Sequence, residues 1–179
     1  MTLKFFYFNK EETTYLANGN FCYFCFMDKR KKTGRYQRLF KQIETLMSTC
    51  NDESARRATI IALLHHKMDY FFWTGYYLLK NDELIVDHYQ GPIACMKLAK
   101  DKGVCWAGIN NKKTVVVPDV HNFAEHISCD SRSQSEIVIP LKNKEGDVIG
   151  VMDIDSSQKN SFDEVDAEYL EKILQLRFH

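Results

Sequence analysis

The sequence predicts an α+β fold in which helices pack on one antiparallel sheet. Three features lead to this prediction: two amphipathic helical stretches early in the chain, short aromatic and β-branched runs joined by tight turns, and an amphipathic helix at the end. Tight turns between successive strands favour antiparallel pairing. The order of helices, strands and a final helix then favours helices segregated on one sheet over alternating βαβ units.

The first helix is predicted from Tyr36 onward, where apolar residues recur at helical spacing up to Met47. A second helix follows to about His66, and either Asn51 or Asp52 can cap its first turn. The closing helix has a predicted capping box formed by Ser161 and Glu164 ahead of an apolar stripe. All three helices therefore have one face suited to burial.

Five strands are predicted, at residues 70–79, 83–89, 113–117, 135–141 and 147–154. Residues 80–82 join the first two and residues 143–146 join the last two, both with turn-forming side chains. Two long non-repetitive segments, 90–112 and 118–134, lie between strands, with a short helix expected near Val104. Loops of that length in a compact domain are usually functional.

Length and composition indicate one ordered domain. The chain has 179 residues, 45% of them hydrophobic and 27% charged, which is enough apolar side chain for a core. We expect the domain at residues 33–179 and an appendage of unclear role at residues 1–32, where no period is evident. Lysine plus arginine and aspartate plus glutamate number 24 each, so no net charge favours nucleic acid or anionic lipid as a partner.

The cysteines are predicted to lie in a reducing compartment. The apolar run at residues 21–27 is far shorter than the roughly 20 residues of a membrane span, and the start of the chain is too interrupted by charge for a signal peptide. We therefore expect a cytoplasmic protein without membrane contact. Its six cysteines would normally stay thiols there, and any disulfide would form transiently during chemistry or sensing.

Cys95, Cys105 and Cys129 all fall in the two long segments between strands. A cysteine used for packing is more often found on the buried face of a regular element, and that bland interpretation stays open for each one alone. A thiol-dependent reductase needs one thiolate that attacks and a second thiol that resolves the resulting sulfenic acid. Two loops that meet can provide both.

Three carboxylates are predicted to gather near the last two strands. Asp153 and Asp155 are two residues apart on one strand and so leave the same face, and Glu136 begins its hairpin partner. The apolar neighbours on this strand would desolvate an acid, raise its pKa and suit it to donate a proton. The alternative is that Asp153 and Asp155 sit at a frayed strand end and bond loop amides.

Trp73 and Tyr77 are expected on one face of the first strand and Tyr76 on the other. Most such aromatic side chains belong to a core, but they can also form the wall of a small-molecule pocket.

A metal site is not expected. His121, His126 and Cys129 match no strong zinc-ligand spacing. Cys22 and Cys25 have a thioredoxin-type gap, yet no βαβ pattern surrounds them, so a redox role there is weakly indicated.

Five stretches closely resemble one enzyme family: WTGYYLL, YQGPIACMKL, KGVCWAGI, VVVPDVHNFAEHISCDSRSQSEIVIPL and GVMDIDSS. They are similar to the free methionine-(R)-sulfoxide reductases, which are single GAF-domain enzymes. The resemblance covers about residues 36–176 and includes the order and spacing of the three loop cysteines. Trp106 departs from it, since many members have a small residue there, and residues 1 to about 30 match nothing in the family.

The resemblance implies a GAF-like fold and reduction of free methionine-(R)-sulfoxide to methionine. Cys129 would be the attacking thiolate, Cys95 the resolving thiol and Cys105 a further cysteine able to enter disulfide exchange, with the choice of nucleophile between Cys129 and Cys105 left open. A thioredoxin-like reductant would reset the disulfide, and no metal or organic cofactor would be needed.

The resemblance also assigns the pocket. Glu136, Asp153 and Asp155 would hold the substrate ammonium and polarise or protonate the sulfoxide oxygen, while Trp73 and Tyr77 would pack the methyl end.

Two other classes of function stay open: a non-catalytic module that senses a small molecule, and an interaction domain that forms a homodimer through its first helices.

Overall fold

The computed structural model describes residues 6–7, 23–124 and 129–176 of the chain. Within them, one sheet of seven strands has the order β1-β5-β6-β7-β2-β3-β4. The strands are β1 Phe6–Tyr7, β2 Trp73–Lys80, β3 Glu83–Gln90, β4 Lys97–Leu98, β5 Val115–Val117, β6 Ser135–Lys142 and β7 Val148–Ser156. Every neighbouring pair is antiparallel except β1 with β5, which is parallel. The predicted α+β class with an antiparallel sheet is confirmed.

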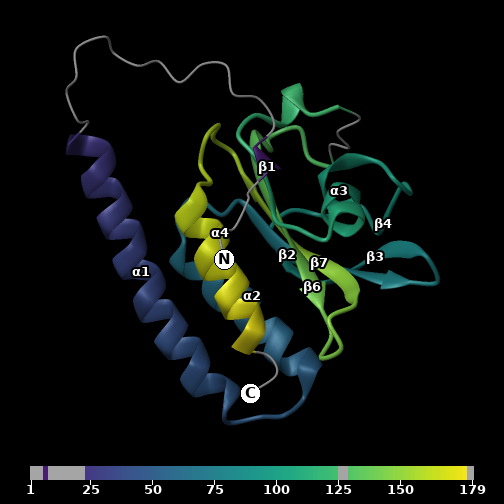
Figure 1. Cartoon of the computed structure of the whole chain (residues 1–179), viewed down its shortest axis with the longest axis horizontal. Helices are drawn as coiled ribbons and strands as arrows, with labels where there is room; N and C mark the ends of the chain where they lie inside the picture. The colour runs from purple at the N-terminus through teal and green to yellow at the C-terminus, as the bar shows by residue number, and fades with distance from the viewer. Residues whose placement is uncertain (1–5, 8–22, 125–128, 177–179) are drawn as a thin grey trace.

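Helices cover both faces of this sheet (Figure 1). Helices α1 (Tyr23–Met47), α2 (Glu53–Lys67) and α4 (Glu164–Gln175) share one apolar core with the sheet face that carries Tyr76 and Met152. Helix α3 (Gly103–Asn111) packs on the opposite face, together with the short 3-10 helix η1 (Val120–Asn122). The larger core therefore stabilises the sheet from one side, and a smaller core under α3 covers the other side.

Helix α1 begins at Tyr23, well before the apolar stripe that predicted its start at Tyr36. The extra part is cationic rather than amphipathic, and its contacts come from distant residues: Lys32 Nζ lies 3.1 Å from Asp163 and 2.6 Å from Asp166. Ion pairs with residues so far away in the sequence leave no trace in the spacing of apolar residues, so the early start of the helix could not be predicted. The helix runs through residues 32 and 33, where the sequence placed the edge of the appendage.

Two of the helix caps were predicted, one correctly. Asp52 caps α2 by accepting a hydrogen bond from the Ala55 amide at 2.8 Å. The predicted Ser161–Glu164 box of α4 is wrong: Asp163 and Asp166 form it, with the Asp163 amide donating to Asp166 at 2.8 Å. Asp166 is fully buried and also accepts from Tyr36, so a contact outside the helix selects this register.

The five predicted strands agree with the structure to within a few residues, whereas the two-residue strands β1 and β4 were not predicted. The first begins at Trp73 rather than residue 70, because the preceding Phe71 amide turns back to bond the Met68 carbonyl. In the part of the chain that the structure describes, no helix is both long and apolar enough to cross a membrane.

Candidate active site

Cys95 and Cys129 form a disulfide across 34 residues of chain, with their Cα atoms 5.6 Å apart. Cys95 precedes β4 at one edge of the sheet, and Cys129 lies in the segment between η1 and β6. The Tyr77 hydroxyl donates to the Cys95 carbonyl at 3.1 Å and so ties this loop to β2. Two of the three cysteines singled out in the sequence thus meet.

Cys105 lies in the first turn of α3, the short helix expected near Val104, and it is buried rather than an accessible thiol. Gly103 starts this helix with a φ of 76°, a left-handed conformation that glycine adopts without strain. Val104 and Trp106 on either side are also buried in the core under α3, so the bulky Trp106 holds the helix against the sheet. Burial raises the pKa of the Cys105 thiol well above its usual value, with Asp153 adding to the effect.

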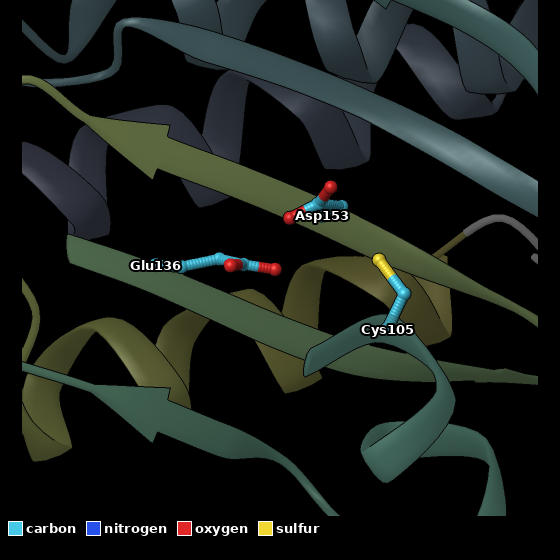
Figure 2. A group of neighbouring side chains, drawn as sticks. All are labelled: Cys105, Glu136 and Asp153. Carbon is cyan, nitrogen blue, oxygen red and sulfur yellow. The ribbon is translucent and has the colours of Figure 1, made fainter. Parts of the chain in front are cut away.

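The three predicted carboxylates come together on the same sheet face. In the β6–β7 hairpin Glu136 pairs with Asp155, and Asp153, two residues earlier on β7, leaves the same face. Figure 2 shows the side chains of Glu136, Asp153 and Cys105 pointing toward one another from β6, β7 and α3. One ligand-type atom from each of these three lies within 4.8 Å of the other two.

These acids are not at a frayed strand end, which removes the alternative left open by the sequence. Asp153 is 7% exposed, and its backbone pairs on both sides, with Gly75 and Val138. Its Oδ1 atom is buried and has no hydrogen-bond partner among the described residues. An unsatisfied buried acceptor is costly and is expected where a ligand completes the site.

Burial raises the pKa of all three carboxyl groups well above the usual range. For Glu136 the next cause is repulsion from Asp155, and for Asp153 it is repulsion from Glu136. For Asp155 it is repulsion from Asp153, partly offset by a hydrogen bond from Ser133. A cluster of this kind holds protons at a pH where ordinary carboxyl groups have lost them, and it can therefore donate a proton to a bound oxygen.

An aromatic wall stands beside the acids. The Trp73 ring stacks between Tyr77, with centroids 5.8 Å apart, and Tyr89, at 5.4 Å. Tyr76 belongs to the core on the other sheet face, as the strand alternation predicted. Burial and then Asp153 raise the pKa of Tyr77, so its phenol stays protonated and remains a hydrogen-bond donor to Cys95.

These groups line one hollow that opens to solvent. All predicted site residues line it except Cys95, which is joined to it through the disulfide: Trp73, Tyr77, Cys105, Cys129, Glu136, Asp153 and Asp155. Ser133, which bonds Asp155, and Ile93 also line it and were not predicted. A serine in a turn and an apolar loop residue give no sequence signal of such a role.

Within the described residues, one group of side chains lies close enough together to hold a metal ion: Cys105, Glu136 and Asp153. His121 is exposed on η1, whereas His126 and the side chains of Cys22 and Cys25 lie outside the described residues. Glu136 and Asp153 line the hollow, so we interpret the group as a polar floor for a small ligand rather than as a metal site.

Comparison with known proteins agrees with this geometry. A family model described as GAF domain matches residues 59–176. "GAF domain-containing protein A" of Dictyostelium discoideum is 45% identical over 84% of this chain and 94% of its own length. "Free methionine-R-sulfoxide reductase" of Escherichia coli is 36% identical over 80% of this chain and 86% of its own length.

Among solved structures, the free methionine-R-sulfoxide reductase of Neisseria meningitidis in complex with its substrate is 38% identical. It superimposes with a TM-score of 0.78 over 82% of this chain and 88% of its own. The fold, the acid-lined hollow and these identities lead to one conclusion: the chain belongs to the free methionine-R-sulfoxide reductase family of GAF-domain proteins.

Proposed function

We propose that this protein reduces free methionine-(R)-sulfoxide to methionine through cysteine thiol chemistry. The observation that carries the proposal is the Cys95–Cys129 disulfide at an acid-lined hollow. A disulfide is the expected end state of one catalytic turnover by two thiols. The Neisseria relative, solved with its substrate, and the named E. coli reductase support this substrate.

Cys129 is the nucleophile in this proposal. It is exposed and lines the hollow, whereas Cys105 is buried and its raised pKa opposes the thiolate form that attack requires. The Cys129 thiolate attacks the sulfoxide sulfur, and the protonated oxygen ends on Cys129 as a sulfenic acid while methionine leaves. The substrate sulfur gains two electrons and the Cys129 sulfur loses two, so the step balances.

The carboxyl cluster supplies the proton and holds the ammonium group. Glu136 and Asp155 pair across the hairpin, and their raised pKa values keep a proton available for the sulfoxide oxygen. Protonation makes the substrate sulfur more electrophilic. Asp153, with its unsatisfied buried Oδ1, joins them in accepting hydrogen bonds from the substrate ammonium. Cys105 remains beside this floor as a further thiol able to enter exchange.

Cys95 resolves the intermediate. Its thiol attacks the Cys129 sulfenic sulfur, the S–S bond forms, and the oxygen leaves as water. A thioredoxin-like dithiol then returns both sulfurs to thiols, which places the cycle in a reducing compartment such as the cytoplasm. Trp73 and Tyr77 pack the methyl end of the substrate, because they give the hollow its apolar wall. Every step up to the disulfide uses the chain's own side chains.

The test is an epimer-resolved assay with dithiothreitol as reductant, comparing free methionine sulfoxide with a peptide that contains the same group. Cys129→Ser should abolish turnover, and Cys50→Ser, which removes an exposed free thiol, should leave it unchanged. The peptide should be rejected, because burying one end of the amino acid without its charge partner is costly. Full turnover by Cys129→Ser, or binding without any sulfoxide consumption as in a sensing module, would refute the proposal.

A further inference from the structure

Two large apolar side chains stand in solvent beside the redox disulfide. Ile93 is 88% exposed and Met96 is 79% exposed, and each is within two residues of Cys95. Among the described residues only one other large hydrophobic side chain is exposed, Tyr89 at 36%, and its ring is stacked on Trp73. Exposed apolar surface gathered at one place commonly marks a contact with another protein.

The proposed function requires such a contact at this place. Each turnover leaves the Cys95–Cys129 disulfide, so a two-electron donor must reach one of its sulfurs before the next substrate reacts. We propose that Ile93 and Met96, named here the docking patch, seat a dithiol reductase protein whose first thiolate attacks Cys95. This inference rests on the proposed function and names the partner surface and the sulfur where electrons enter.

Attack at Cys95 follows from how the two sulfurs are placed. Cys129 is exposed but lines the hollow, whereas the half-buried Cys95 does not line it and is the direct chain neighbour of Met96, so a protein seated on Met96 lies beside Cys95. The segment is also held in position, because the Cys95 carbonyl accepts from Tyr77 and the Met96 carbonyl accepts from the Val86 amide at 3.0 Å. A fixed segment presents its sulfur without an ordering cost.

The exchange balances in two steps. The donor thiolate bonds to Cys95 Sγ, the Cys95–Cys129 bond breaks, and Cys129 leaves with the electron pair as a thiolate inside the hollow. The second donor thiolate then attacks the first donor sulfur, which frees Cys95 and leaves the donor as a disulfide. Cys129 is thereby returned in the form that attacks the next sulfoxide.

The sheet topology narrows the partner further. The segment leads into β4, the last strand of the sheet within the described residues. An open edge allows an extended partner segment to pair there.

The first test compares a protein donor with a small one. The variant Met96→Ser changes the part of the docking patch that does not line the hollow, and it should raise the KM for thioredoxin by about tenfold, since burial of such a side chain is worth on the order of tenfold in affinity. Its turnover with dithiothreitol and its KM for the sulfoxide should not change. The matched control Met96→Leu keeps the surface apolar and should behave as the wild type.

Two outcomes would overturn the docking proposal. An unchanged KM for thioredoxin in Met96→Ser would show that the docking patch does not seat the donor, and an equal loss with both donors would make the patch merely structural. Absence of turnover with dithiothreitol in the wild type would instead count against the proposed function, so the two failures are distinguishable.

The second test identifies the attacked sulfur without any turnover. Thioredoxin with its second cysteine changed to serine is mixed with the oxidised protein in a Cys22→Ser/Cys25→Ser/Cys50→Ser background, and the trapped mixed disulfide is mapped by peptide mass spectrometry. We expect the link at Cys95. A link at Cys129, or no link at thioredoxin concentrations that reduce other protein disulfides, would refute the assignment.

Discussion

Replacing Asp153 with asparagine should stabilise the protein at neutral pH while impairing catalysis. The carboxyl group is buried, and its pKa in the folded protein lies well above that in the unfolded chain. A raised acid pKa contributes stability that is fully present below the unfolded pKa and is lost as pH rises toward the folded one. The amide has the same shape and does not ionise, so Asp153→Asn removes this loss.

The magnitude follows from the linkage relation. Over each pH unit in which the folded protein holds a proton that the unfolded chain has released, stability falls by about 1.4 kcal/mol per group. Between pH 5 and pH 7 the variant should therefore gain up to about 2 to 3 kcal/mol over the wild type. The Glu136 and Asp155 carboxyls stay in place, so the stability of the variant still falls as pH rises, but less steeply than that of the wild type.

The assay is urea unfolding of the oxidised protein at pH 5 and pH 7, with the free energy of unfolding compared between wild type and variant. Glu145→Gln is the matched control, because it makes the same carboxyl-to-amide change at the exposed turn of the same hairpin, and it should give the same small difference at both pH values. If the difference in free energy of unfolding between Asp153→Asn and the wild type does not grow with pH, the argument that this acid is buried with its proton is refuted.

Three further substitutions test the frame around the site. Gly108→Ala on α3 should destabilise by about 1 to 3 kcal/mol in thermal unfolding, because the added Cβ would lie 2.8 Å from Val138 Cγ1; an unchanged melting temperature would contradict that packing. Arg56→Ala should cost about 2 to 4 kcal/mol in urea, since its guanidinium bonds two main-chain carbonyls at 2.6 Å in the α1–α2 turn, and an exposed-arginine control such as Arg38→Ala should cost little. Tyr77→Phe should slow disulfide formation after a single turnover by up to about tenfold through loss of its bond to the Cys95 carbonyl, measured as free thiol against time.

The parts of the site that were predictable from sequence are those set by local periodicity. Strand alternation alone places Asp153 and Asp155 on one face, and the short hairpin turn brings Glu136 to the same end of the sheet. The same rule separated Tyr77 from Tyr76. A two-residue period survives tertiary packing because both neighbouring strands enforce it.

The features that the sequence did not reveal depend on contacts between distant segments. The short helix near Val104 was expected, but not the burial of Cys105, which depends on how Trp106 and the sheet face beneath pack α3. The α4 cap was misplaced because Lys32 and Tyr36, more than a hundred residues away, select Asp166 as its partner. The pairing of Cys95 with Cys129 came from family resemblance, since spacing alone does not determine a disulfide.

The acid cluster and the disulfide occupy parts of the fold with opposite mechanical demands. Glu136 and Asp153 sit on β6 and β7, central strands whose pairing on both sides holds buried carboxyl groups that would otherwise seek water. Cys95 and Cys129 sit on segments outside the central strands, where thiols can part for substrate and rejoin as a disulfide with little disturbance to the core. A reductase that both polarises a sulfoxide and remakes an S–S bond in each cycle needs this division, because proton donation requires a buried floor and sulfur exchange requires a disulfide that a reductant can reach.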